Sequence, residues 1–473
     1  MSTSPTSPPA TTSASSTGRL GTHHLVLMIV AAAAPLGVAV GNLPAGLVLG
    51  NGVGLPAAFL VAALVIACVA IGFIRLAREV HADGGFVDLV RAGLGDGSSL
   101  AVAYLTGVAY WTGSLSLAAS FGYFSALIAE TLGIDVPWWV LTFAAFALVL
   151  FLGRRAADLS AKMLLLLLAA EVAVLLVLNA AILVRHGAAA LPLEVFSPEN
   201  VLSGNIGPAV LVGFTSFIGV ESAILYTRET RDPARSMPRA TFAAIGVIGT
   251  LYVLTAWLVI GGLGTATAVE QAGELEGELV FALGQNELGD TFLALLQIVF
   301  VTSLLACFVA LHNASSRYTQ TLASRGALPR RLAVVHPTHL APSAASTALV
   351  GVGVVLFIVF AALGAAPYIG IATSLTGLFT LGIVLAQAIV SISVVVYFRR
   401  AGTAPSFTTF VAPVLGAVGA LLASLAIVTN YSVLTGSTST AARLVPLVLL
   451  AVFVAGYVVQ ARRGGRETEL PRP

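Results

Sequence analysis

Apolar stretches of membrane-spanning length recur along this chain and constrain its fold more than any other feature. About 20 apolar residues cross the roughly 30 Å hydrocarbon core of a bilayer as a helix. Of the 473 residues, 58% are hydrophobic and only 9% are charged, whereas a soluble domain carries about 25% charged residues. The sequence therefore predicts an all-α integral membrane protein with twelve transmembrane helices. These helices are expected at residues 24–50, 54–76, 98–129, 137–153, 161–184, 207–227, 240–264, 291–316, 343–365, 369–398, 410–432 and 441–461.

The positions of the Lys and Arg residues predict how the helices are oriented. Basic residues are retained on the cytoplasmic side of a membrane, and only Arg185 and Arg443 of the 23 Lys and Arg residues fall in loops on the side opposite to the N-terminus. We therefore expect a protein of the cytoplasmic membrane with both termini in the cytoplasm. Residues 1–23, rich in Ser, Thr, Pro and Ala, are expected to form a disordered cytoplasmic tail. The acidic residues 265–290, which include no base, predict a solvated outer loop.

Two of the twelve spans depart from ordinary apolar helices. The first contains Pro35 and several glycines, which weaken a helix, so we expect it to unwind near residues 37–42. The sixth contains Gly219 and the ionisable Glu221 in its middle. Interrupted backbone at membrane depth is tolerated only where it is buried in protein or lines a cavity, and paired interruptions in corresponding spans indicate a transporter built from inverted repeats. Ordinary glycine packing with a proline kink is the alternative.

The most specific motif lies at residues 213–241, GFTSFIGVESAILYTRETRDPARSMPRAT. It resembles the sixth helix and following loop of the amino acid/polyamine/organocation (APC) transporter superfamily, where a phenylalanine-rich run precedes Gly-x-Glu, an acidic Asp-Pro turn and Pro-Arg-Ala. Segments 20–37, 83–95 and 315–345 are similar to other parts of the same family, so the resemblance extends over roughly residues 20–400. The matching motif positions are Phe214, Phe217, Gly219, Glu221, Glu229, Thr230, Asp232, Pro233, Pro238, Arg239 and Ala240.

This resemblance implies a secondary active transporter, or permease, that moves an amino acid or related amine by alternating access. It also implies a leucine-transporter-like fold, with two inverted five-helix repeats, broken helices 1 and 6, and two further helices at the C-terminus. We expect the repeats at residues 24–185 and 207–400, helices 11 and 12 at residues 405–462, and a cytoplasmic tail at residues 463–473.

The family's site lies between helices 1, 3, 6, 8 and 10, and broken helices there offer a zwitterion two kinds of partner. N–H groups that begin a helical segment carry partial positive charge, and carbonyls that end one are free acceptors. Since Gly37 and Gly41 replace the closely spaced Gly-x-Gly usual in the family, another small organic solute is the alternative cargo. The predicted contacts are Ala39, Val40, Gly41 and Asn42 for the carboxylate, and Pro35, Leu36, Phe217, Ile218 and Gly219 for the ammonium.

Aromatic residues near this site are candidates for the gate and the pocket. Phe214 and Phe217 lie three residues apart in helix 6 and could close over a bound solute by stacking. The alternative for both is a core or lipid-facing role. Tyr110 in helix 3 is a candidate pocket residue, although tyrosines also favour membrane interfaces.

Two acidic residues lie clearly within predicted spans, where a charge is costly and an acid is a functional candidate by default. Glu171 is ten residues into helix 5, about 15 Å from its start, and loss of water there favours the neutral form of a carboxyl group. We expect Glu171, which occupies the place of a lysine in proton-coupled members of the family, to bind the coupled proton. A permanently protonated acid is the alternative. Glu221 is expected to accept N–H groups of helix 1 or 7, or else to contact the substrate ammonium.

Sodium coupling is the alternative to proton coupling, because the hydroxyls of Thr302 and Ser303 on helix 8 could join helix 1 carbonyls around a hard cation. An enzyme is not expected, since the seven histidines lie in loops or near helix ends, without metal-ligand spacing to Cys or acids. A passive channel is a further alternative, and it would differ from a carrier because its flux would not saturate as the solute concentration rises. No cofactor, resident metal or nucleic acid is predicted as a partner, and the expected partners are the solute, protons and the lipid bilayer.

Overall fold

The structure is a computed structural model that describes residues 21–80, 85–154, 161–222, 230–338, 341–436 and 440–463. The regular elements in these ranges are helices, in agreement with the predicted all-α class. The predicted tails lie outside the described residues apart from residues 21–23 and 463, and so do residues 223–229 of the family motif.

Ten helices in the described ranges are long and apolar enough to cross a membrane. Two shorter apolar helices, Trp138–Leu152 and Ile206–Ser222, occupy the predicted fourth and sixth spans. Each predicted span is matched by an apolar helix, but the total of twelve membrane crossings stays a prediction. The ten long helices are Thr22–Leu49, Gly52–Val80, Phe86–Thr131, Leu165–Ala190, Ala234–Leu263, Asp290–Ser324, Ser343–Ala362, Pro367–Arg400, Phe407–Thr429 and Ala442–Arg463.

Several spans consist of more than one helical element. Helices α1 and α2 together form the first span, and α8 forms the first half of the sixth. In α4, Gly95 has a φ of +84°, a conformation that glycine adopts without steric cost, so a short helix precedes the long span. The α-helices are α1 Thr22–Ala32, α2 Leu43–Leu49, α3 Leu55–Val80, α4 Phe86–Thr131, α5 Trp138–Arg154, α6 Ala161–His186, α7 Pro198–Val201, α8 Ile206–Thr215, α9 Pro233–Leu263, α10 Ala268–Leu275, α11 Leu279–Leu288, α12 Asp290–Ser324, α13 Ser343–Ala362, α14 Thr373–Arg400, α15 Ala412–Thr429, α16 Tyr431–Leu434, α17 Thr440–Leu444 and α18 Leu447–Arg463.

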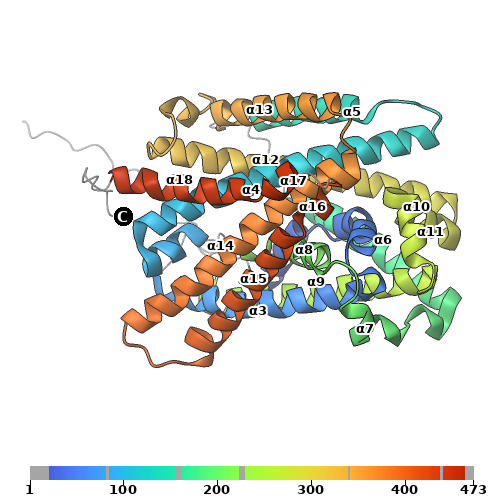
Figure 1. The fold of residues 1–473 in the computed structure, drawn as a ribbon, viewed down its shortest axis with the longest axis horizontal. Coiled ribbons are helices and arrows are strands. Elements are labelled where there is room, and N and C mark those ends of the chain that lie inside the picture. The colour runs from blue at the N-terminus through green and yellow to red at the C-terminus, as the bar shows by residue number, and fades with distance from the viewer. Residues whose placement is uncertain are drawn as a thin grey trace, which may run out of the picture.

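The long helices form one bundle whose two ends differ in charge (Figure 1). At one end, on the left of the view, α3, α14 and α18 finish with basic residues, among them Arg78, Arg400 and Arg463. We call this the basic end. The opposite end carries the glutamate-bearing helices α10 and α11, and we call it the acidic end.

Burial differs strongly between the helices of the bundle. In the most apolar stretch of the span that contains α14, 72% of the residues are buried inside the protein. The corresponding shares are 28% for α13 and 17% for the span that contains α18. Helix α14 packs along α4 and α15, whereas α13 and α18 leave most of their apolar surface open to the surrounding lipid. Since a helix that is apolar all round needs either protein or lipid around it, α14 belongs to the centre of the bundle and α13 and α18 to its rim.

Candidate functional site

The first span is interrupted earlier than the sequence predicts. Helix α1 ends at Ala32, and Ala34 has a φ of +46°, which removes it from the helix. Residues 37–42, where unwinding was expected, instead form a π-helical turn that leads into α2. The physical reason is Pro35, because proline disfavours a helical conformation at the residue before it and lacks the N–H that would continue the helix.

The sixth span is interrupted at the predicted place, and the two interruptions touch. Helix α8 ends at Thr215, and Gly219 has a φ of +113°, a conformation that side-chain-bearing residues rarely adopt. A Cβ atom on Gly219 would lie 2.8 Å from the Cβ atom of Ala32, at the end of α1. The absence of a side chain at Gly219 therefore lets the two broken backbones meet inside the bundle.

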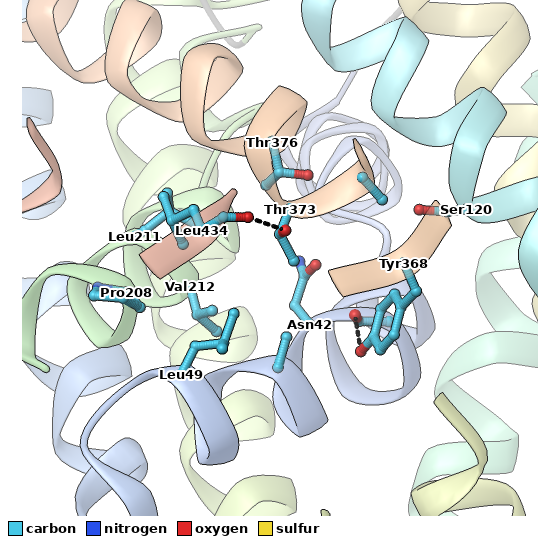
Figure 2. Close-up of a pocket in the computed structure, with 13 residues that line it drawn as sticks. Asn42, Leu49, Ser120, Pro208, Leu211, Val212, Tyr368, Thr373, Thr376 and Leu434 are labelled. Atoms are coloured by element: carbon cyan, nitrogen blue, oxygen red, sulfur yellow. Dashed lines mark hydrogen bonds between the residues drawn. The ribbon is translucent and has the colours of Figure 1, made fainter. Parts of the chain in front are cut away.

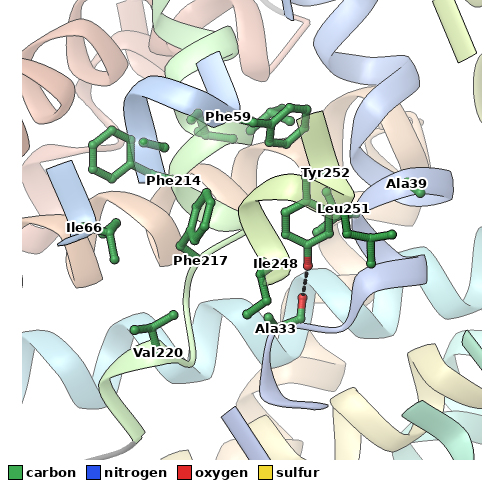
Figure 3. Close-up of a cluster of buried hydrophobic side chains, with 14 of the residues drawn as sticks. Ala33, Ala39, Phe59, Ile66, Phe214, Phe217, Val220, Ile248, Leu251 and Tyr252 are labelled. Carbon is green, nitrogen blue, oxygen red and sulfur yellow. Dashed lines mark hydrogen bonds between the residues drawn. The ribbon is translucent and has the colours of Figure 1, made fainter. Parts of the chain in front are cut away.

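Side chains from two other helices hold the break in helix 1. The backbone N–H of Leu36 donates to Oε2 of Glu171 on α6, over 3.1 Å. The hydroxyl of Tyr252 on α9 donates to the carbonyl of Ala33, over 2.8 Å (Figure 3). Glu171 is buried, and Ser303 of α12 lies within interaction distance of its carboxyl group. Helices α6 and α9 therefore converge on the backbone groups that the break leaves open, and α12 contacts the carboxyl group that α6 supplies.

The break in helix 6 is held by its own glutamate. Oε2 of Glu221 accepts the N–H of Gly219 over 3.0 Å, and Oε1 accepts the hydroxyl of Tyr110 on α4 over 3.4 Å. The expected backbone-holding contact of Glu221 is thus present, but its donors come from helix 6 and α4 and not from helix 1 or 7. A carboxylate two residues beyond the turn can reach back to it, as side chains do at helix caps.

Neither buried carboxyl group has a basic partner among the residues that the structure describes. The ion pairs there involve other acids, at the surface or at the ends of the bundle. An isolated charge in this environment costs several kcal/mol, on the order of the penalties for intramembrane acids. In place of a counter-ion, Glu171 and Glu221 are therefore suited to bind a proton or a polar group of a solute, or to accept a hydrogen bond from a backbone N–H.

A cavity lies beside α2, in the second half of the first span (Figure 2). The space within it measures about 30 Å³, enough for a few water molecules. The cavity brings together α2, α8, α14 and the α16 segment, and its wall is mostly apolar. Its polar side chains are Asn42, Ser120, Tyr368, Thr373 and Thr376.

The predicted substrate contacts are distributed over the break and the cavity. Gly41 and Asn42 line the cavity, whereas Ala39 and Val40 are buried within the π-helical turn. Leu36 and Gly219 lie at the breaks with their N–H groups bonded to the two glutamates. The remaining predicted contacts are not among the residues that line the cavity and lie beside the breaks: Pro35, Tyr110, Phe217, Ile218 and Glu221.

The predicted gate residues lie in a hydrophobic cluster. Phe214 and Phe217 are both buried there beside Phe59 and Tyr252 (Figure 3), and the rings of Phe217 and Tyr252 meet edge to face at 6.1 Å. Their role as a gate stays a prediction. For the alternative sodium site, Ser303 faces Glu171, but the hydroxyl of Thr302 donates to the carbonyl of Ile298 in its own helix.

Sequence reasoning missed the residues that α14 and α9 bring to the site. The hydroxyl of Tyr368 donates to the carbonyl of Gly41 over 2.8 Å, just before α14 begins (Figure 2). Ile369 and Gly370 depart from helical geometry there, and the hydroxyls of Thr373 and Thr376 follow. The signal was a Pro/Gly-flanked run of hydroxyl residues inside an apolar span. Tyr252 gave a weaker signal in the sequence, because it is a single tyrosine in an apolar run.

Structural comparison identifies the fold. A mutant of the Eremococcus coleocola manganese transporter is 13% identical in sequence, with 96% of each chain covered and a TM-score of 0.55. MhsT in complex with L-phenylalanine is 15% identical, with 85% of this chain and 98% of that chain covered and a TM-score of 0.60. The chain therefore shares the fold of leucine-transporter-like transporters, and because one of these proteins is named a manganese transporter and the other binds L-phenylalanine, the fold leaves the cargo open.

Sequence comparison identifies the family. An uncharacterized transporter of Mycobacterium bovis (strain ATCC BAA-935 / AF2122/97) is 30% identical over 329 residues, 68% of this chain and 70% of its own. An uncharacterized transporter of Mycobacterium tuberculosis (strain CDC 1551 / Oshkosh) matches to the same extent. The sequence profile of the amino acid permease family matches residues 20–455. These matches confirm the predicted transporter class, and this multi-pass membrane protein belongs to the amino acid permease family of the APC superfamily.

Proposed function

We propose that this chain is a proton-coupled secondary active transporter of an amino acid or a related small amine. The observation that carries the proposal is the contact between Glu171 and the N–H of Leu36, a buried acid bonded to the break in helix 1. A carboxylate accepts an N–H group more strongly than the neutral acid does. Protonation of Glu171 therefore weakens the bond that ties α6 to helix 1, and loss of the proton restores it.

This bond lies where alternating access needs a hinge. The break separates α1 from the π-helical turn and α2, so α1 can change direction without unwinding a helix. A ligand or proton shifts such an equilibrium only by its differential affinity for the two states. Glu171 supplies that difference for the proton, and the backbone groups around the cavity supply it for the solute.

The proposed solute site joins the cavity to the break. We place the solute carboxylate against the N–H groups near Gly41 and Asn42, which line the cavity, and the ammonium towards the carbonyls around Pro35 and the acid Glu221. The rest of the wall is mostly apolar, and the cavity has to widen before it holds an aliphatic or aromatic side chain.

We also propose the topology that this mechanism requires. Residues 24–185 and 207–400 form the two inverted repeats, residues 405–462 form helices 11 and 12, and the basic end faces the cytoplasm. The touching interruptions in the first span of each repeat and the basic residues gathered at one end of the bundle support this arrangement.

The test is solute uptake into proteoliposomes with an imposed pH gradient. A panel of radiolabelled amino acids and amines is screened first with the unaltered protein, at equal sodium concentration on both sides. Glu171→Gln should then abolish uptake driven by the pH gradient and retain exchange of labelled for unlabelled solute. Glu130→Gln, the same change at an exposed position of α4, is the matched control and should leave both intact.

Two results would overturn the proposal. Full gradient-driven uptake by Glu171→Gln would remove Glu171 from coupling. Uptake that follows a sodium gradient, is insensitive to pH and is lost in Ser303→Ala would favour the sodium alternative.

A further inference from the structure

Helix α14 carries a polar stripe along the side that starts in the cavity. The stripe consists of Thr373, Thr376, Thr380, Gln387 and Ser391. At 3.6 residues per turn these positions fall within about 60° of one another around the helix. The last three are almost fully buried. Polar side chains on one side of a helix at the centre of the bundle need hydrogen-bond partners there.

The part of the stripe near the acidic end is satisfied by hydrogen bonds. Thr376 shares a hydrogen bond with Ser116 of α4 and lines the cavity (Figure 2). One turn further, Thr380 shares a hydrogen bond with Thr215, the last residue of α8. These contacts place the stripe beside the cavity first and beside the break in helix 6 next.

The part of the stripe beyond the break is not satisfied. Gln387 and Ser391 are only 3% and 0% exposed, and neither Oε1 of Gln387 nor Oγ of Ser391 has a hydrogen-bond partner among the residues that the structure describes. An unpaired buried polar atom costs free energy, and native proteins hold few of them. Ser393, which points about 160° away from Ser391 on the same helix, is bonded to the carbonyl of Leu89. Within α14, the buried side-chain atoms without a partner therefore lie in the stripe.

A third unpaired atom comes from α4 at the same level. Tyr110 of α4 and Ile383 of α14 belong to one buried cluster beside the break in helix 6. The two helices are antiparallel, since Gly382 lies against Ala109 and Gly93 against Ser393. Thr106, one turn before Tyr110, and Gln387, one turn after Ile383, are therefore both displaced from this cluster towards the basic end, and Oγ1 of Thr106 also lacks a partner.

We propose that Gln387, Ser391 and Thr106 form a second solute subsite, on the basic-end side of the two breaks, for the N–H-bearing group of the solute. This inference rests on the proposed function, because it assumes that an amino acid or amine passes through the bundle. The amide and hydroxyl oxygens accept hydrogen bonds from an ammonium group as it leaves the acid at Glu221. Because none of the three carries a charge, they hold the solute weakly enough for it to continue, as multi-site conduction requires.

The test measures solute affinity from each side of oriented proteoliposomes, with a solute that the unaltered protein transports. In Gln387→Met, which keeps the side-chain length and removes the acceptor, KM measured from the basic end should rise about tenfold. KM measured from the acidic end should change less than about threefold. Gln387→Glu retains an acceptor and should restore the affinity for solutes that carry an ammonium group. Ser393→Ala, on the opposite face, is the control and should leave both KM values unchanged.

A thermal-unfolding measurement separates this subsite from a structural role. Because the amide oxygen of Gln387 is buried without a partner, replacing the side chain by an apolar one of similar shape should leave the unfolding temperature unchanged or raise it. The inference is overturned if Gln387→Met leaves both KM values unchanged, or if it lowers the unfolding temperature and affects both sides equally. If the unaltered protein transports no amino acid or amine, the proposed function itself fails, and that result is distinguishable from either outcome. Ser391→Ala provides a second variant should Gln387→Met fold poorly.

Discussion

The two interrupted spans are held by carboxyl groups in opposite ways. At the break in helix 1 the carboxyl group comes from another helix, since Glu171 of α6 accepts the N–H of Leu36. At the break in helix 6 the carboxyl group is local, since Glu221 accepts the N–H of Gly219, two residues before it. The first contact depends on how helices are positioned relative to one another, whereas the second is closed within a single turn of chain.

Because of this difference, we expect substitutions of the two acids to have different effects on transport. A change at Glu221 alters a local turn that a neutral acceptor of the same shape can still hold. A change at Glu171 alters a contact between two helices, one of which contains a hinge. Under the proposed mechanism only the interhelical contact converts protonation into movement.

The largest effect is expected from adding a side chain where the two breaks touch. Gly219→Ala forces a φ of +113° on alanine and places its Cβ atom 2.8 Å from that of Ala32. We expect little folded protein and no transport, because neither backbone can retreat without losing its bond to a glutamate. Detergent size-exclusion and thermal unfolding measure the loss.

A matched glycine of α9 serves as the control for that substitution. A Cβ atom on Gly246 meets nothing within 4 Å, and alanine is favoured over glycine within a helix by about 1 kcal/mol. Gly246→Ala should therefore leave folding and transport intact or slightly raise the unfolding temperature. Wild-type stability of Gly219→Ala would contradict the requirement for close contact between the breaks.

The next effect separates the two glutamates directly. Glu171→Gln should remove the pH dependence of transport, since the amide cannot gain or lose the coupled proton. Glu221→Gln should retain it, because an amide oxygen can still accept the N–H of Gly219. Transport is measured between pH 5 and pH 8 with equal pH on both sides. A loss of pH dependence in Glu221→Gln and not in Glu171→Gln would reverse the assignment.

The sequence predicts that these two spans are interrupted but not how each interruption is held. Proline and glycine have local consequences, so Pro35 and Gly219 were sufficient to indicate breaks. Whether residues 37–42 unwind or form a π-helical turn depends on their neighbours in space, and here the break moved to Ala34, before the proline. An intramembrane acid such as Glu171 stands out in an apolar sequence, but its partner lies 135 residues away.

The partners of the breaks were harder to predict for the same reason. Tyr252 is one tyrosine in an apolar helix, and only the packing of α9 against α1 brings it to Ala33. The hydroxyl residues of α14 repeat with the period of a helix, yet hydroxyl groups in membrane helices are commonly bonded to their own backbone. Their orientation towards the cavity comes from the position of α14 at the centre of the bundle.

A smaller effect is expected from the tyrosine at the break in helix 1. Tyr252→Phe removes the donor to the carbonyl of Ala33 and leaves that carbonyl buried, which costs about 1–3 kcal/mol. The ring keeps its contacts with Phe59 and Phe217, so the core should stay packed. We expect a lower unfolding temperature and slower transport with coupling retained. An unchanged unfolding temperature would indicate that Tyr252 does not help to hold the break.

The smallest effect is expected from the tyrosine at the break in helix 6. Tyr110→Phe removes a hydrogen bond of 3.4 Å, long compared with the 2.8 Å bond of Tyr252. Glu221 keeps the N–H of Gly219, and a hydrogen bond this long is weak. The loss should therefore stay below about 1 kcal/mol, as measured by thermal unfolding beside Tyr252→Phe. If Tyr110→Phe proved the more destabilising of the two, the break in helix 6 would depend on contacts with other helices as much as the break in helix 1 does. The proposed difference between a local contact at Glu221 and an interhelical contact at Glu171 would then be wrong.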